Sequence, residues 1–211
     1  LKAALNMREK LLQYQYDFFN NARKEAKALD QEAYIFGAPN DPAKAFHLAE
    51  ILERHQIEIR ALKNDISLGG KVYPKASAYL VPKKQKNSRL LKAMFERRTT
   101  FRDSLFYDIS AWTLPLAFDL NFTDKGKMKY ADQSMLPELP QGQVSQKSDY
   151  AYIMPWSDYY SPKALNILFQ KNVRVKMALQ PFSSGSKSFD YGSILVPVQN
   201  QAHSSEKIHK I

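Results

Sequence analysis

Apolar residues recur at intervals of three, four or seven through the first 29 residues, which is the spacing of one face of an α-helix. The opposite face of this segment is rich in Lys, Arg, Glu, Gln and Asn. The pattern therefore predicts one long helix with a single apolar stripe, which consists of Leu1, Leu5, Leu12, Tyr16, Phe19, Ala22, Ala26 and Leu29.

Short apolar runs and helical segments alternate after residue 30. The run AYIFGA (33–38) is typical of a strand buried on both faces, and Asp41 followed by Pro42 is a typical helix start. The alternating segment IEIRAL (57–62) predicts a second strand. Because strand, helix and strand follow one another, the pattern predicts a β-α-β unit with parallel strands and a right-handed crossover.

The same kind of pattern continues to residue 120 and then changes. ASAYLVP (76–82) predicts a third strand, residues 87–98 a helix, and LFYDI (105–109) a fourth strand. Residues 121–149 are mostly polar and contain two Pro and two Gly. This composition predicts a long loop that links two halves of the chain.

The order of elements then repeats. Ala33-Tyr34-Ile35 matches Ala151-Tyr152-Ile153, and IEIRAL matches VRVKMAL (173–179). AYLVPKKQ (78–85) likewise matches SILVPVQ (193–199), so that both segments end in Gln. The matches predict an internal duplication of β-α-β units. The expected fold is α/β, with a mostly parallel, flavodoxin-like sheet and flanking helices.

This pattern divides the chain into four parts. We expect an N-terminal helix that joins to an upstream region, a first α/β unit, a long loop or linker, and a second α/β unit that continues in a longer protein. The chain begins without Met and already in a helical pattern, which also suggests a piece of a longer polypeptide. The boundaries of the four parts are 1–30, 31–120, 121–149 and 150–211.

The composition excludes several classes of protein. Hydrophobic residues make up 44% and charged residues 25%, as in globular domains with a buried core. No apolar run reaches the about 18 residues of a membrane span. The chain has no Cys, which excludes disulfides, thiolate zinc sites and cysteine nucleophiles.

The formal net charge is +10, and much of it lies between Lys83 and Arg102. This segment holds eight basic residues and one acid, a net charge of +7. One hypothesis is an anion- or nucleic-acid-binding module. The alternative is the solvated face of a helix, which we favour because no aromatic residues alternate with the charges to stack on bases.

Motifs for catalysis and metal binding are sparse. His47 and Glu50 have the spacing of an H-x-x-E zinc pair, but no third ligand is evident, so we interpret them as structural. No glycine-rich phosphate loop and no G-x-S-x-G motif occurs. The segment YDISAWTLPLAF (107–118) suggests a strand followed by a tight turn that presents Ser110.

Ser110, supported by Asp108, is therefore one candidate for an independent hydrolase site. The alternative is a structural corner, because the flanking glycines and a His base are missing. Candidate ligand-binding residues are Asp108, Ser110, Trp112, Gln85 and Trp156. Aromatic and polar residues at predicted strand ends suggest a peptide or glycan groove, or an interface; they are Trp112, Trp156, Tyr159, Tyr160, Gln85 and Gln199.

The segments YDISAWTLPLAF, AYLVPKKQ and GSILVPVQNQ together resemble the C-terminal half of long bacterial zinc carboxypeptidases, which are relatives of carboxypeptidase A. The resemblance extends over nearly the whole chain. It implies an α/β domain of the glutamine-amidotransferase type behind an N-terminal peptidase domain. It also implies that zinc and its ligands belong to that peptidase domain, and not to His47 and Glu50.

The resemblance implies a non-catalytic accessory domain of a secreted or periplasmic hydrolase. Amidotransferase activity is not expected, because that fold uses a Cys nucleophile and this chain has no Cys. The role would be structural, oligomerising or substrate-holding. The expected partners are the upstream peptidase domain, a second copy of the chain and a peptide substrate, without nucleic acid or a membrane span.

Overall fold

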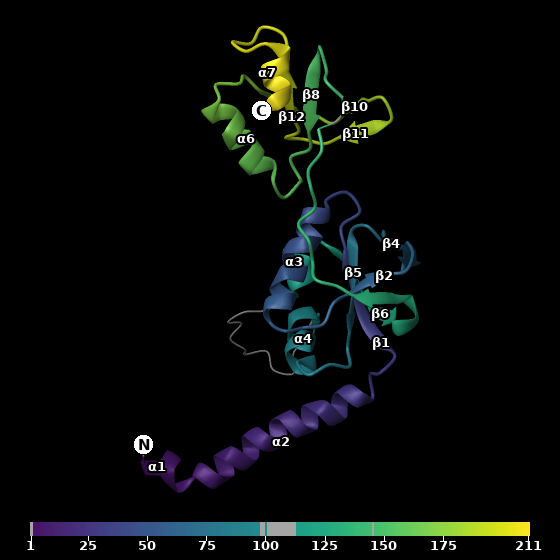
Figure 1. Ribbon diagram of the computed structural model, residues 1–211, viewed down its shortest axis with the longest axis vertical. Coiled ribbons are helices and arrows are strands. Elements are labelled where there is room, and N and C mark those ends of the chain that lie inside the picture. The colour runs from purple at the N-terminus through teal and green to yellow at the C-terminus, as the bar shows by residue number, and fades with distance from the viewer. Residues whose placement is uncertain (1, 98–99, 101–112, 145) are drawn as a thin grey trace. The chain divides into compact units, whose positions relative to one another are not determined.

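The computed structural model describes residues 2–97, 100, 113–144 and 146–211. These residues form two compact units, of which the first ends at Leu139 and the second begins at Pro140. Figure 1 labels most of their helices and strands.

The first unit begins with helices α1 (Lys2–Asn6) and α2 (Arg8–Lys27), separated by Met7. The prediction of one helix over residues 1–29 is therefore nearly matched. Only the C-terminal part of α2 is packed, since Ala22 and Ala26 are its buried residues. There α2 lies beside α4, whose Arg89 forms an ion pair with Glu25.

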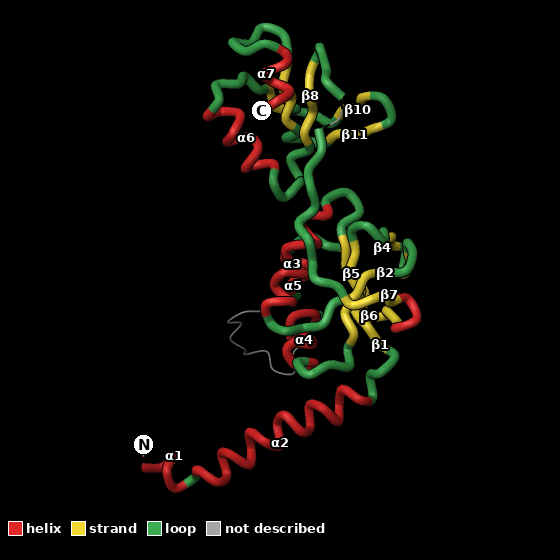
Figure 2. The backbone as a smooth tube through the Cα atoms, viewed as in Figure 1, coloured by secondary structure: helices red, strands yellow, loops and turns green. Residues whose placement is uncertain are grey.

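A five-stranded sheet forms the centre of the first unit, in the order β6-β1-β5-β2-β7. Helices α3, α4 and α5 lie on one side of it (Figure 2). The elements are β1 (Glu32–Gly37), α3 (Pro42–Arg54), β2 (Arg60–Leu62), β3 (Ile66–Leu68), β4 (Lys71–Tyr73), β5 (Ala78–Pro82), α4 (Ser88–Phe95), α5 (Leu114–Ala117), β6 (Asn121–Lys127), the 3-10 helix η1 (Met128–Tyr130) and β7 (Ala131–Ser134).

The predicted start of α3 is confirmed. Asp41 precedes the helix, and its side chain accepts a hydrogen bond from the backbone N–H of Ala43. Pro42 takes the first helical position, where no N–H is required. The helix ends at Arg54, and Gln56 then adopts a left-handed conformation that turns the chain into β2.

The prediction of a mostly parallel, flavodoxin-like or amidotransferase-like sheet is wrong. β5 pairs antiparallel with both β1 and β2, so these two strands run the same way but are not neighbours. The outer strands β6 and β7 are also antiparallel to their neighbours. The reason is the β3–β4 hairpin, which turns at Gly69 and Gly70 and returns the chain between β1 and β2.

Both faces of the sheet are covered, which explains why β1 and β5 have continuous apolar sequences. Tyr34 and Phe36 on β1 face a cluster with α3 and α4. Ile35 faces the opposite cluster, where Tyr73 of the β3–β4 hairpin is buried. All residues of β5 are buried.

Residues 121–149 are not a loop throughout, as predicted, since they contain β6, η1 and β7. β6 lies very close to β1 at Gly126. A Cβ at this position would lie 2.7 Å from the carbonyl oxygen of Ala33. The glycine that suggested a loop therefore permits a close strand pairing.

The second unit has a three-stranded antiparallel sheet in the order β8-β12-β9 and a separate β10–β11 hairpin. Its core contains Val173, Ile194, Val196, Val198 and Ile208. The elements are β8 (Ala151–Met154), α6 (Ser161–Gln170), β9 (Lys176–Met177), β10 (Phe182–Ser184), β11 (Lys187–Phe189), β12 (Ile194–Pro197) and α7 (Ser205–Lys210).

The two units share one arrangement of strand, helix, strand, hairpin, strand and helix. In the first unit β5 lies between β1 and β2, and in the second β12 lies between β8 and β9. The registers also agree, because Tyr34 pairs with Val81 as Tyr152 pairs with Val196. The described part of the second sheet has no equivalents of β6 and β7.

Candidate functional site

Three of the five predicted ligand-binding residues, Asp108, Ser110 and Trp112, lie outside the described residues. The hypothesis of a hydrolase site near Asp108 and Ser110 therefore stays a prediction. The other two, Gln85 and Trp156, belong to different units. Trp156 is 42% exposed and lies beside Gly192 in the second unit.

Gln85 connects two strands of the first unit. Its Oε1 accepts a hydrogen bond from the backbone N–H of Glu58 at 2.8 Å, and its Nε2 donates to the carbonyl of Pro82. Both polar ends of this half-buried side chain are thus engaged within the fold. This geometry supports a structural role for Gln85.

The equivalent residue in the second unit is Gln201, and not Gln199 as the sequence match suggested. Its Oε1 accepts from the N–H of Arg174 at 2.9 Å, and its Nε2 donates to the carbonyl of Pro197 at 2.7 Å. Sequence comparison missed this residue because it lies four positions after its Pro, one more than Gln85. The repeated Gln near each LVP segment was the available signal.

His47 and Glu50 lie on the same face of α3, with Nδ1 and Oε2 separated by 3.6 Å. Glu50 also accepts a hydrogen bond from Arg54 at 2.8 Å. Within the described ranges, no group of three or more His, Cys, Asp or Glu side chains is arranged to hold a metal ion.

The basic segment from Lys83 to Arg102 is partly neutralised by acids of the first unit. Lys83 pairs with Glu32 at 2.8 Å, Lys84 pairs with Asp30, and Arg89 pairs with Glu25. The hydrogen bonds from Arg89 and Lys83 hold the pKa of Glu25 and of Glu32 below the usual range. These three cations are therefore engaged in ion pairs within the first unit.

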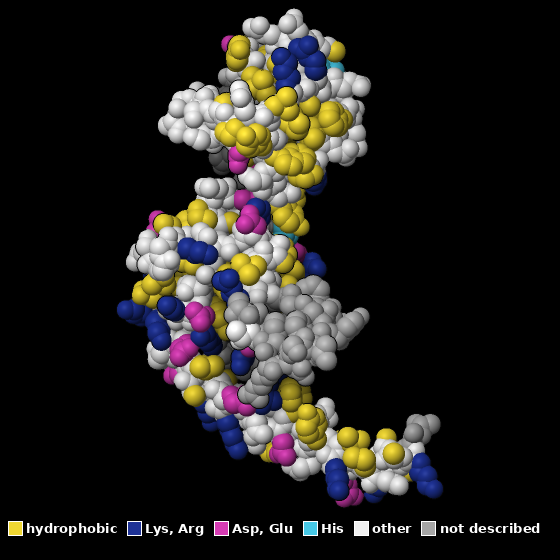
Figure 3. All heavy atoms as spheres, turned by 180° about the vertical axis from the view of Figure 1, so that it is seen from behind, with side chains coloured by type: hydrophobic (Ala, Val, Ile, Leu, Met, Phe, Trp, Pro, Cys, Tyr) yellow, Lys and Arg dark blue, Asp and Glu magenta, His cyan; other side chains and the backbone are white. Residues whose placement is uncertain are grey.

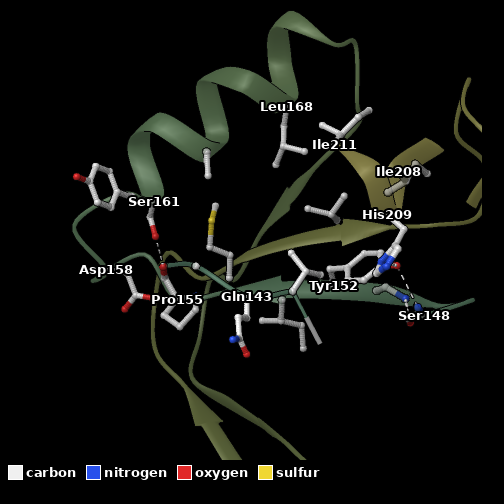
Figure 4. A pocket seen from close by; sticks show the side chains of 18 of the residues that line it. Gln143, Ser148, Tyr152, Pro155, Asp158, Ser161, Leu168, Ile208, His209 and Ile211 are labelled. Carbon is white, nitrogen blue, oxygen red and sulfur yellow. Dashed lines mark hydrogen bonds between the residues drawn. The ribbon is translucent and has the colours of Figure 1, made fainter. Parts of the chain in front are cut away.

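The second unit contains an open hollow of about 990 Å³ beside β8 (Figure 4). Its lining includes residues of α6, α7, β8, β10, β11 and β12 and of the segment that precedes β8. Apolar side chains include Met154, Leu168 and Ile208. Its walls therefore suit an apolar ligand group.

Hydrogen bonds within the unit order the polar residues of this hollow. The hydroxyl of Tyr152 accepts from the N–H of Ser148 and lies 3.0 Å from Nδ1 of His209. Ser161, which is buried, donates from its hydroxyl to the carbonyl of Pro155. Figure 4 shows Ser161 beside Pro155, and Tyr152 beside His209 and Ser148, at the wall of the hollow. These residues escaped sequence analysis because no motif links them.

A second candidate surface lies on α2. Its apolar side chains remain largely in solvent, although they continue the stripe that is buried at Ala22 and Ala26. Leu12 is 64% exposed and Phe19 is 50% exposed. Figure 3 shows hydrophobic atoms gathered along this helix. The α2 face is defined here as Leu12, Tyr16 and Phe19, the exposed members of this stripe, while Leu11, Tyr14 and Phe18 are exposed on a neighbouring side of the helix.

No helix in the described part of the chain is both long enough and apolar enough to cross a membrane. Comparisons with protein-family models, with curated proteins and with solved structures found no match. The resemblance to zinc carboxypeptidases therefore stays a prediction.

Proposed function

We propose that this chain is a non-catalytic accessory domain of a secreted or periplasmic zinc carboxypeptidase and attaches to the peptidase domain through the α2 face. The observation that carries the proposal is the exposure of that face. Soluble surfaces rarely carry a contiguous apolar patch of this kind unless it is an interaction site.

The arrangement of residues on α2 supports attachment to a protein. Two of the three side chains of the α2 face, Tyr16 and Phe19, are aromatic, and aromatic residues are enriched in protein interfaces. Residues 2–27 hold six basic and three acidic residues, a net charge of +3. A partner surface with an apolar centre and an acidic rim would complement them.

The choice of partner rests on the family resemblance. That resemblance places zinc, its ligands and the hydrolytic step in the peptidase domain. The accessory domain then stabilises that domain by covering apolar surface, at about 25 cal/mol for each Å² buried. The resemblance also supports the proposed location in the periplasm or outside the cell.

The test compares variants of the whole polypeptide as its gene encodes it. Replacing both Leu12 and Phe19 by Gln should weaken the contact between the α2 face and the peptidase domain. The isolated chain should keep its circular dichroism spectrum, because both side chains are exposed. The control replaces Lys10 and Lys24, on the polar side of the helix, by Gln.

The α2-face variant should lose peptidase activity faster on heating and be cut more readily by a protease between the two domains. The control should behave as the unaltered protein. Two outcomes contradict the proposal: a reading frame without a metallopeptidase domain, or an α2-face variant as stable as the control.

A further inference from the structure

The outer edge of β1 in the first unit and the equivalent edge of β8 in the second unit differ in whether another strand covers them. In the first unit, β6 pairs with the outer edge of β1, and Ala33, Tyr34, Ile35 and Phe36 are at most 9% exposed. In the second unit, β8 takes the place of β1. Its four residues are only half-buried, and β8 is an edge strand within the described ranges.

The backbone of β8 shows which groups face this edge. The N–H of Val198 donates to the carbonyl of Tyr150, so Tyr152 and Met154 also direct their backbone groups toward β12. Ala151 and Ile153 therefore direct theirs outward. The outward N–H of Ala151 donates to Oγ of Ser148, which leaves the N–H and carbonyl of Ile153 at the centre of the edge.

The hollow of about 990 Å³ surrounds this edge. Its lining includes Tyr152 and Met154 from one face of β8, and Ala151 and Ile153 from the other. In the first unit, Phe122 of β6 packs against the cluster that contains Tyr34 and Phe36. A strand laid along β8 would have space for side chains on both faces.

We propose that β8 binds an extended peptide segment of another polypeptide, which adds to the sheet as an antiparallel fourth strand. Backbone hydrogen bonds to the carbonyl of Ala151 and to the N–H and carbonyl of Ile153 would supply affinity, and the hollow would select apolar side chains at alternate positions. The second unit holds eight basic and four acidic residues, a net charge of +4, and Lys187, His209 and Asp158 line the hollow. Acidic residues at the remaining positions would complement this charge.

The probe is a synthetic seven-residue peptide with Phe, Leu and Val at alternate positions and Glu or Thr between them. Binding to the full chain is measured by fluorescence anisotropy and by the amide NMR shifts of β8. Two further peptides carry N-methyl groups on one or the other set of alternate amides. One set should weaken binding about tenfold or more, because it faces β8, and the other should not.

Ile153→Pro is the matched protein variant. It removes the outward N–H of Ile153 and replaces one apolar side chain of the lining by the shorter proline ring, and proline is tolerated on edge strands. We expect this variant to fold and to lose affinity for the peptide. The α2-face variant should bind the peptide with normal affinity, so a failure of the proposed function can be distinguished from a failure of this inference. Absence of binding, or equal affinity for both methylated peptides, would overturn the inference. The inference would also be overturned if the chain associates with itself and Ile153→Pro abolishes this self-association, because the strand bound at β8 would then belong to a second copy.

Discussion

Gln85→Ala tests the bridge that joins the segment before β2 to the end of β5 in the first unit. The substitution removes the acceptor for the N–H of Glu58 and the donor to the carbonyl of Pro82. Each hydrogen bond contributes about 1 kcal/mol, and an unsatisfied buried N–H costs about 1–3 kcal/mol. Because Glu58 is only half-buried, water can replace part of the loss. We therefore expect a total loss of about 2 kcal/mol.

Amide hydrogen exchange is the suitable assay, because it reports on each unit separately. A loss of about 2 kcal/mol corresponds to roughly 30-fold faster exchange of the Glu58 amide. Gln201→Ala should have the same effect on the Arg174 amide in the second unit and leave Glu58 unchanged. Gln85→Glu keeps the acceptor and should retain most of the protection at Glu58. Unchanged exchange of the Glu58 amide in Gln85→Ala would refute the assigned role.

Two further predictions concern ionisable groups. Tyr73→Phe should leave the free energy of unfolding unchanged or raise it by about 1 kcal/mol, because the buried hydroxyl has no hydrogen-bond partner in the described structure. The same burial raises the pKa of Tyr73 to about 12. A clear loss of stability of Tyr73→Phe in denaturant unfolding would contradict the prediction. The hydrogen bond from Lys147 lowers the pKa of Glu206 to about 2 from 4.5, so its stabilising contribution is present above about pH 4.5 and is lost as the pH falls toward 2. Lys147→Met should return this pKa toward 4.5 in an NMR titration, and a pKa that stays near 2 would exclude the pair as the cause.

Local features that depend on neighbouring residues were predictable from the sequence. The helix after Asp41 and Pro42 follows from capping and from the fixed φ of proline, both of which act within one turn. The stripe on residues 1–29 predicted the helical region and its apolar face. The matched segments around Tyr34 and Tyr152 lie at equivalent strand positions.

The candidate surfaces were only partly predictable. The apolar stripe on α2 was visible in the sequence, but its exposure depends on how far α4 reaches along the helix. The hollow beside β8 gave no sequence signal, since Tyr152, Ser148 and His209 come together only in the folded unit. Asp108, Ser110 and Trp112 lie outside the described residues, so the hypothesis built on them is unchanged.

The sequence by itself determined the helices α2, α3 and α4, the strands β1, β5, β8 and β12, and the repeat in their order, because periodicity, caps and turn residues act over a few positions. It did not predict β6 and β7, which lie in the segment that its composition marked as a loop. Only the tertiary structure decided which strands are neighbours. The β3–β4 hairpin places β5 between β1 and β2, and the absence of a side chain at Gly126 lets β6 pair with β1. Strand adjacency is set by hydrogen bonds between distant segments, and no local pattern encodes it. The open edge of β8 likewise follows from strand adjacency, because β8 pairs with β12 on one side only in the described sheet.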